Sequence, residues 1–355
     1  MRTNQRAAIV LRSDDKILFI DRTKEQKNYM ILPGGGVESD ESPKEAAVRE
    51  ASEELGVKVE VLRPIIQIEN RGQEEFYFEC KLVSGSVKVL GDHNLYEDVS
   101  IEDVEKYVKI DQILDYPIVP NKIKLYLAAF YDVPQKIKTL DDINFVEIRE
   151  NPPYIPEFVK NIPIIENSTW HDKESVFEHT LNVIEALNML KDSIKASAKT
   201  VLSTKIDKYS RGELLMLSAL LHDVAKKDTI TPDGEDTLCT NHEEKGAIAA
   251  QAILARLDLS EDEKNIVTET IANHNEIHLL TGGDFVDPLQ HAEFKEKYKN
   301  VYLELVMLGG ADVAATHHSA REVGLRTLAL REDFYKLELG LSKDEKVFTG
   351  IFSKK

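Results

Sequence analysis

Short runs of apolar or alternating residues dominate the front of the chain. They occupy residues 6–12, 16–21, 29–32, 57–68, 73–84 and 104–110. Runs of this length, bounded by turn residues, predict β-strands. The Ser13-Asp14-Asp15 turn between the first two runs predicts a hairpin. Two helices are expected among these strands, at 43–55, ended by Gly56, and at 120–132, where Pro120 opens the helix.

The spacing changes to that of helices from Lys173 onward. Phe177, Leu181, Ile184 and Leu187 form the first apolar stripe. Further helices are predicted over residues 212–226, 243–257, 261–273, 293–317 and 321–340. The segment between the two patterns contains five prolines: Pro134, Pro152, Pro153, Pro156 and Pro163. We therefore expect a domain over residues 1–133, a connector over 134–165 and a helical domain over 166–355.

Composition and charge exclude several classes of protein. The 355 residues carry a net charge of −18, which argues against a general nucleic-acid binder held by phosphate contacts. Bound metal ions could still supply local positive charge for nucleotides. The two cysteines, Cys80 and Cys239, predict neither a disulfide framework nor a thiolate zinc cluster. With no signal-peptide pattern and no apolar stretch of membrane-spanning length, the expected location is cytoplasmic, without a membrane partner.

Three glutamates in the predicted helix 43–55 carry candidate chemistry. Glu50, Glu53 and Glu54 stand at i, i+3 and i+4, so they share one face. Clustered carboxylates suit Mg²⁺ or Mn²⁺, and the glycines before the helix allow the backbone to approach the ion closely. Arg49 stands where its guanidinium can hold a glutamate of the cluster. An exposed acidic helix is the simpler interpretation of the glutamates alone, but it does not account for the full pattern around them.

That full pattern resembles the Nudix box, Gly-x5-Glu-x7-Arg-Glu-U-x-Glu-Glu-x-Gly-U, where U is apolar. Its fixed positions are Gly35, Glu41, Arg49, Glu50, Ala51, Glu53, Glu54, Gly56 and Val57. The resemblance implies an α/β/α sandwich built on a mixed sheet. It also implies Mg²⁺- or Mn²⁺-dependent hydrolysis of a nucleoside diphosphate linked to a further group. Among Nudix proteins, Leu32-Pro33-Gly34-Gly35-Gly36 is most similar to the branch that hydrolyses nucleoside triphosphates, deoxynucleoside triphosphates or oxidised nucleotides.

The resemblance also assigns roles within the box. Glu50, Glu53 and Glu54 are the expected metal ligands, with the carbonyl of Gly35 as a further ligand and Gly36 beside the substrate. Glu53 is the best candidate for activating water, although the box alone does not separate base from ligand. A further carboxylate often comes from outside the box. Glu105 is the first candidate for it, followed by Glu102 and Glu97.

A second set of candidate ligands lies in the helical half. Its members are His179, His222, Asp223, His242, His274 and Asp312. A single histidine of this kind is more often a satisfied polar residue than a ligand. Together, beside apolar residues, they would be costly to bury without partners. A shared metal ion would offset that cost.

The order His, His-Asp, Asp resembles an HD-domain phosphohydrolase, an all-α fold. The phrases Glu178–Leu181, Leu221–Lys226 and His242–Ala247 are similar to the HD module of bacterial CCA-adding enzymes. The resemblance implies one divalent cation bound by His179, His222, Asp223 and Asp312. His242 and His274 match a second metal, which Asp223 would bridge. Lys226 would bind a phosphate, although Ala225 stands where the family often has glycine.

Mixed nitrogen and oxygen ligands favour Mn²⁺, Fe, Co²⁺ or Ni²⁺ over Mg²⁺. The implied substrates are nucleotide phosphomonoesters or phosphodiesters, including 2′,3′-cyclic phosphates. No nucleotidyltransferase signature is present, so CCA addition is not expected. Six other histidines have no motif, and most are expected to be exposed: His93, His171, His278, His291, His317 and His318.

Three functional interpretations remain open from the sequence. The first is a bifunctional enzyme with both sites active. The second is an enzyme with one active domain and one nucleotide-sensing or scaffold domain. The third is a ligand-sensing regulator, which the complete set of box glutamates argues against. Small-molecule nucleotides are the expected partners, RNA ends are a further candidate, and a homodimer is compatible with the Nudix resemblance.

Overall fold

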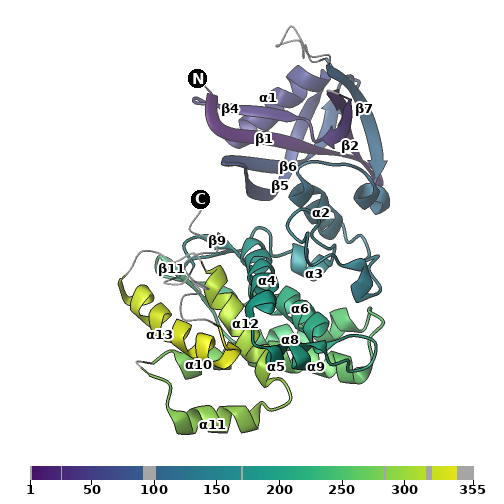
Figure 1. Ribbon diagram of the computed structural model, residues 1–355. Helices are drawn as coiled ribbons and strands as arrows, with labels where there is room; N and C mark the ends of the chain where they lie inside the picture. Colours follow the sequence, from purple (N-terminus) through teal and green to yellow (C-terminus); the bar gives the residue numbers. More distant parts are fainter. Residues whose placement is uncertain are drawn as a thin grey trace. The chain divides into compact units, whose positions relative to one another are not determined.

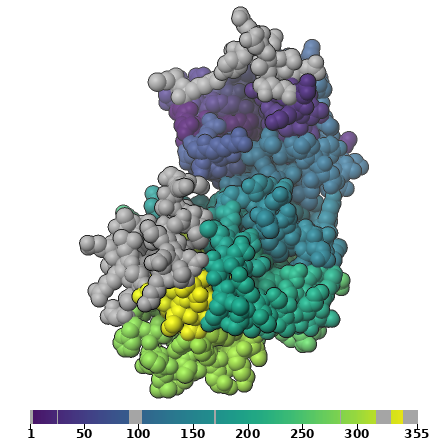
Figure 2. Space-filling model, viewed as in Figure 1, coloured from purple at the N-terminus to yellow at the C-terminus, as the bar shows by residue number. Residues whose placement is uncertain are grey.

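The computed structural model describes residues 2–24, 26–90, 101–168, 171–283, 285–316 and 322–341, with the backbone alone at residues 2, 101–102 and 322–330. The chain divides into two compact units, Met1–Pro134 and Gln135–Lys355 (Figure 1). In Figure 2 the purple to blue atoms belong to the first unit and the teal to yellow atoms to the second. Apart from Pro134, the residues expected to form a connector fall in the second unit.

The first unit is built on a seven-stranded mixed sheet. Its strands are β1 (Arg2–Ser13), β2 (Lys16–Lys24), β3 (Lys27–Ile31), β4 (Gly34–Glu38), β5 (Lys58–Asn70), β6 (Gln73–Ser84) and β7 (Ile101–Lys109). The order is β3-β2-β1-β6-β5, with β4 paired to β1 and β7 paired to β2. β1 and β6 are parallel, whereas the other pairs are antiparallel. The predicted hairpin is confirmed, since Ser13 pairs with Lys16.

Helix α1 (Pro43–Leu55) has the bounds that the sequence predicts. Ser42 and Glu45 form a capping box at its start, and Gly56 ends it with φ of 65°. Its buried face packs on the sheet around Ile9. The unit also contains a 3₁₀ helix, η1 (Ile110–Asp115), and helix α2 (Asn121–Phe130). Helix α1 also contacts β4, where Gly34 and Gly35 lie beside the carboxylates of Glu54 and Glu50.

The second unit is mostly helical. Its helices are α3 (Pro156–Val159), α4 (Val176–Ser193), α5 (Ala196–Ser203), α6 (Arg211–Leu221), α7 (Lys226–Thr229), α8 (His242–Leu254), α9 (Glu261–Asn273), α10 (Glu276–Thr281), α11 (Pro288–Lys297), α12 (Tyr302–Ala315) and α13 (Glu322–Leu339). A short 3₁₀ helix, η2 (Leu140–Asp142), precedes them. Two small hairpins accompany them: β8 (Ile165–Glu166) with β9 (Glu174–Ser175), and β10 (Ile230–Asp233) with β11 (Asp236–Cys239). Helix α4 packs against α6 and α12.

Two of the predicted helices are broken in the structure. The segment 293–317 forms α11 and α12, separated by a turn in which Tyr298 and Val301 are both buried. Apolar residues therefore continue across the break, and the sequence pattern did not show it. The segment 212–226 likewise divides after Leu221, where hydrogen bonds change to the i→i+3 type. In the described part of the chain, no helix has both the length and the hydropathy to cross a bilayer.

Candidate metal sites

Arg49 organises the carboxylates of α1. Its Nε and Nη2 donate to the two oxygens of Glu41 at 3.1 and 2.7 Å. Its Nη1 donates to Glu50 Oε1 at 2.7 Å and to Glu53 Oε2 at 2.9 Å, and its Nη2 also donates to the carbonyl of Gly36. These carboxylates raise the pKa of Arg49 above its usual range, chiefly through the hydrogen bond to Glu41. The expectation that Arg49 holds a box glutamate agrees with this geometry.

The glycine loop and the box glutamates fit closely together. The N–H of Gly34 donates to Glu54 Oε2 at 2.7 Å. A Cβ placed on Gly35 would lie 2.4 Å from Glu50 Oε1, so a larger residue there would displace the carboxylate of Glu50. Glu50 is buried, whereas the side chain of Glu53 is 59% exposed. Burial raises the pKa of Glu54, against the opposing hydrogen bond from Gly34. A cation at this face would therefore meet one exposed and two sheltered carboxylates.

Glu105, the predicted carboxylate from outside the box, makes no contact with the box among the described residues. Glu105 is exposed on β7, where it pairs with Ile20. Among the described residues it makes no hydrogen bond or ion pair with a box residue, so its role stays a prediction. Glu97 and the side chain of Glu102 lie outside the described residues.

The second unit brings the HD candidates together from separate elements. His179 lies on α4, His222 and Asp223 follow α6, and His242 begins α8. His274 ends α9, and Asp312 lies on α12. In the described ranges, groups of three or more candidate ligand atoms within 4.8 Å of one another occur in this unit alone. All six residues of the predicted set belong to such groups.

Asp223 is the centre of this cluster. Its Oδ2 lies 3.2 Å from His222 Nε2 and 4.0 Å from His179 Nε2. Its Oδ1 lies 3.5 Å from His242 Nε2 and 3.9 Å from His274 Nε2. The two oxygens therefore face different pairs of imidazoles, as expected of a carboxylate that bridges two cations.

Backbone carbonyls fix the orientation of three of these rings. The Nδ1 atoms of His222, His242 and His274 lie 2.8, 3.0 and 2.7 Å from the carbonyl oxygens of Ala219, Cys239 and Ile271. A carbonyl only accepts, so each Nδ1 must carry the proton. The Nε2 atoms are then the ones that face Asp223, which is the usual arrangement of metal-binding histidines, and those of His242 and His274 also lie 3.3 Å from each other.

The donor set fits a divalent cation. His222 Nε2 and both oxygens of Asp223 are buried without a hydrogen-bond partner among the described residues, although Asp223 Oδ2 forms an ion pair with Lys226. Leaving such atoms unpaired is costly. Burial opposes ionisation of Asp223, but His222 and Lys226 hold its pKa well below its usual range. A buried carboxylate that faces several imidazole nitrogens is a mixed oxygen and nitrogen donor set, which suits a transition-metal ion.

Asp312 links His179 to a histidine that the sequence did not single out. Asp312 Oδ1 lies 2.7 Å from His179 Nε2, and its Oδ2 lies 2.8 Å from His278 Nε2. His278 stands four residues after His274, on the next helix, and this short spacing is the signal that could have identified it. Burial opposes a proton on His179, but Asp312 and Glu174 raise its pKa to about 10.

The remaining predicted residue, Lys226, is buried in an ion-paired network. Its Nζ lies 2.9 Å from Asp223 Oδ2 and 2.7 Å from Glu166 Oε2. Burial opposes charge on Lys226, but the two carboxylates raise its pKa well above the usual range. The phosphate-binding role of Lys226 stays a prediction.

The expectation that most histidines without a motif are exposed is wrong for those described. His171 is buried, and His278 and His291 are partly buried. His171 lies against Glu174, His278 against Asp312, and His291 against Tyr302. Each therefore has a polar partner that offsets the cost of burial. His93, His317 and His318 lie outside the described residues.

The cluster makes the stability of the metal-free protein depend on pH. Burial, with His222 and His242 nearby, lowers the pKa of His274 to about 3. Unfolding therefore takes up a proton below pH 6.5, and stability falls as the pH is lowered. His179, with its pKa of about 10, releases a proton on unfolding above pH 6.5, so stability also falls as the pH rises. One such proton changes the free energy of unfolding by about 1.4 kcal/mol per pH unit.

In the chelator-treated full-length protein, the free energy of unfolding of the second unit should be highest near pH 6.5. Urea unfolding at pH 5, 6.5 and 8, followed by the fluorescence of the single tryptophan, Trp170, measures it. In the variant His274→Asn, the loss on the acid side should become smaller. A steady rise in stability from pH 5 to pH 8 would contradict these protonation states.

Comparisons with known proteins agree with both halves of the sequence analysis. A NUDIX domain model matches residues 1–129 and an HD domain model matches residues 176–315. The bifunctional uridylyltransferase/uridylyl-removing enzyme of Azotobacter vinelandii is 30% identical over 167 residues, which are 46% of this chain and 17% of that protein. A MutT-like protein of Streptomyces ambofaciens is 37% identical over 81 residues, 22% of this chain and 51% of its own. The solution structure of the E. coli ORF135 protein, 26% identical, covers 36% of this chain and 88% of its own, with a TM-score of 0.29.

Proposed function

We propose that this chain, which carries a NUDIX domain at residues 1–129 and an HD domain at residues 176–315, is a bifunctional metal-dependent nucleotide hydrolase. The NUDIX domain would cleave phosphoric anhydrides and the HD domain phosphoesters. The chain spans only 17% of the Azotobacter relative and about half of the Streptomyces relative. The activities of those whole proteins therefore support the class of reaction rather than the substrate.

One observation carries the proposal. Asp223 is buried with both oxygens turned toward imidazole nitrogens, and its ionised form is strongly favoured. Backbone carbonyls accept from the Nδ1 atoms of three of those imidazoles, so their Nε2 atoms are directed into the cluster. Asp223 Oδ2 is also paired with Lys226, whereas Asp223 Oδ1 has no hydrogen bond within the described part of the chain and lies 3.5 and 3.9 Å from the Nε2 atoms of His242 and His274. This arrangement supports a site for one or two divalent cations.

For the NUDIX domain, the proposed substrates are nucleoside diphosphates linked to a further group, including nucleoside triphosphates, deoxynucleoside triphosphates and oxidised nucleotides. Bound Mg²⁺ or Mn²⁺ would neutralise charge on the phosphates. Glu53 is the most exposed of the box glutamates and the one best placed to take a proton from water. Arg49 fixes Glu50 and Glu53 relative to each other. The carbonyl of Gly35 is proposed as a further ligand.

For the HD domain, the proposed substrates are phosphomonoesters or phosphodiesters of nucleotides, including 2′,3′-cyclic phosphates. Mn²⁺, Fe, Co²⁺, Ni²⁺ or Mg²⁺ would lower the pKa of a bound water and polarise a phosphoryl oxygen. His179, His222, Asp223 and Asp312 would hold one cation, and His242 and His274 a second. The name of the Azotobacter relative includes the removal of uridylyl groups, and a uridylyl group is itself a nucleoside monophosphate unit.

Removal of the metal ions tests both proposals. After treatment with a chelator and desalting, pyrophosphate release from a nucleoside triphosphate panel and hydrolysis of a phosphoester panel should each fall to background. Mg²⁺ or Mn²⁺ should restore the first activity, and Mn²⁺ or Co²⁺ the second, because the two donor sets differ. If one activity returns and the other is never observed, the interpretation with a single active domain is correct. Persistence of either activity without metal would contradict the proposal for that domain.

A further inference from the structure

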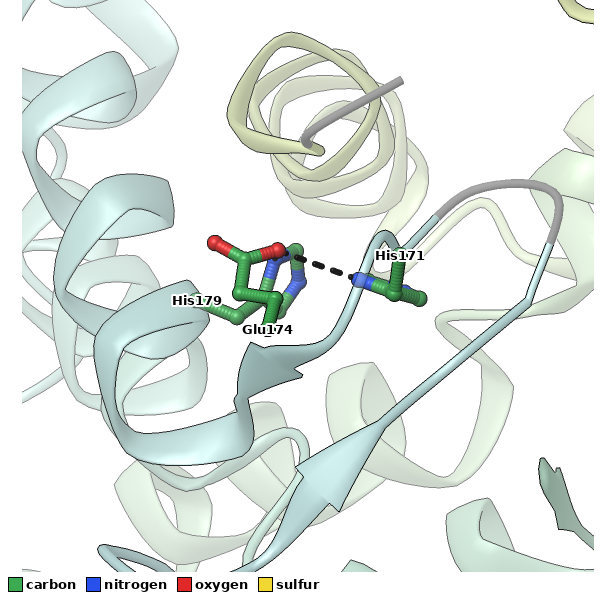
Figure 3. Close-up of side chains that lie close together, drawn as sticks. All are labelled: His171, Glu174 and His179. Atoms are coloured by element: carbon green, nitrogen blue, oxygen red, sulfur yellow. Dashed lines mark hydrogen bonds and ion pairs between the residues drawn. The ribbon is translucent and has the colours of Figure 1, made fainter. Parts of the chain in front are cut away.

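The hairpin of β8 and β9 places three ionisable residues beside the HD cluster. Glu174 of β9 lies between His171, from the hairpin loop, and His179 of α4 (Figure 3). Glu174 Oε2 is 3.2 Å from His171 Nδ1 and 3.5 Å from His179 Nδ1. The two rings contact each other edge to face at 4.7 Å. Because all three side chains are buried, their relative positions are restricted by packing.

The carboxylate of Glu174 is itself held from the other side. Asn182 of α4 donates from Nδ2 to Glu174 Oε1 at 2.8 Å. The orientation of that amide is fixed because Asn182 Oδ1 accepts from Arg149 Nη2 at 2.6 Å. Arg149 is fixed in turn by two hydrogen bonds to Glu185. A chain of defined donors and acceptors therefore ends on Glu174.

His179 has to present one nitrogen to a cation. Its Nε2 faces Asp312 and Asp223. Its Nδ1 is buried, makes no hydrogen bond to any residue that the structure describes, and lies 3.5 Å from Glu174 Oε2. A carboxylate beside Nδ1 favours the tautomer protonated there. The lone pair of Nε2 is then directed at the cluster, as backbone carbonyls achieve for the other three histidines.

We propose that Glu174 is a positioning residue, which holds the ring of His179 with Nδ1–H toward itself and Nε2 toward the metal. This inference rests on the HD metal site of the proposed function. His171 extends the same support, since its Nε2 lies 3.6 Å from Glu166, which is bonded to Lys226. Lys226 contacts Asp223. Two predicted ligands, His179 and Asp223, are thereby supported from one hairpin.

The same three residues could instead form a metal site of their own, because their ligand atoms lie within 4.8 Å of one another. Such a site would take the Nδ1 lone pair of His179. To bind a second cation in the HD cluster through Nε2 at the same time, the ring would have to lose both N–H protons and become an imidazolate anion. The positioning role requires only a neutral imidazole, so we favour it.

Titration of the full-length, chelator-treated chain with Co²⁺ tests the inference, because the visible absorption of Co²⁺ reports its ligand geometry. The variant Asp223→Ala first defines the part of the signal that belongs to the HD cluster. Glu174→Gln should then weaken that part by about 10–100-fold in affinity, the usual effect of losing a carboxylate behind a metal-binding histidine. It should also change the shape of the absorption band. Glu174→Asp should recover part of the affinity.

A matched control separates positioning from general destabilisation. Glu304 on α12 is equally buried and forms an ion pair with Arg211. Glu304→Gln should lower the melting temperature while leaving Co²⁺ affinity and absorption unchanged. Should Glu174→Gln fail to fold, Asn182→Ala provides a second variant with the same expected direction and a smaller effect.

Four outcomes would be decisive. Unchanged Co²⁺ affinity in Glu174→Gln overturns the inference. Loss of one whole Co²⁺ equivalent, with the other equivalents unaffected, also overturns it and makes the triad a metal site. If Asp223→Ala leaves Co²⁺ binding intact, the ligand set is wrong and the inference fails with it. If the wild-type chain binds Co²⁺ as expected but hydrolyses no phosphoester, the proposed function fails while the positioning role stands.

Discussion

The variant Asp223→Ala should lose phosphoester hydrolysis by at least about 100-fold in kcat/KM, since loss even of a residue that only supports a metal ligand costs about 10–100-fold. Asp223 faces four imidazoles and is the only residue of the cluster whose two oxygens meet different pairs of them. Its removal would also leave Lys226 paired with Glu166 alone. The measurement is steady-state hydrolysis of a phosphoester panel with Mn²⁺ or Co²⁺.

Two controls make that result specific. Asp228→Ala removes an exposed carboxylate nearby on α7, paired only with Lys227 in the described structure, and should retain full activity. Pyrophosphate release by the NUDIX domain should be the same in Asp223→Ala as in the wild type. The expected loss leaves about a hundredth of the wild-type rate or less. If Asp223→Ala retained more than about a tenth of that rate, the HD cluster would not be the phosphoesterase site.

The variant Glu53→Gln should cause a comparably large loss of pyrophosphate release by the NUDIX domain. Glu53→Gln removes an exposed carboxylate that accepts from Arg49 and stands on the same helical face as Glu50 and Glu54. Loss of a general base or a metal-binding charge should lower kcat for pyrophosphate release by about 10²–10⁴-fold. The assay is pyrophosphate release from a nucleoside triphosphate panel with Mg²⁺.

Glu45→Gln is the matched control for this variant. Glu45 lies on the same helix and accepts from the N–H of Ser42, a bond that glutamine can still make. Its activity should be close to that of the wild type, and phosphoester hydrolysis should be unchanged in both variants. Full pyrophosphate release by Glu53→Gln would show that the box glutamates are not the catalytic machinery.

The NUDIX half could be predicted in detail because its chemistry is local. A helix places residues at i, i+3 and i+4 on one face whatever surrounds it. The bounds of α1, its capping box and Gly56 all follow from residues next to one another in sequence. The contact of Arg49 with the carbonyl of Gly36 was not foreseen, since it joins the helix to a strand.

In the HD half the sequence indicated the candidate ligands but not how they meet. Which oxygen of Asp223 faces which imidazole depends on the packing of α4, α6, α8 and α9, and no spacing encodes it. The supporting residues were missed for the same reason. Glu174 and Glu166 belong to a short hairpin without a motif, and each also has a partner on another element, Asn182 and Lys226 respectively. The apolar pattern also predicted one continuous helix here. The helix instead ends at Leu221, and His222 and Asp223, which follow it, lie within the cluster.

The central claim is that one chain holds divalent cations at two separate sites. Anomalous diffraction from crystals of the full-length protein soaked with Mn²⁺ tests it most directly. We expect one peak beside Glu50, Glu53 and Glu54 and at least one peak beside Asp223. The crystals must diffract well enough to show bound Mn²⁺. If their anomalous map then has a peak at neither position, the account is contradicted.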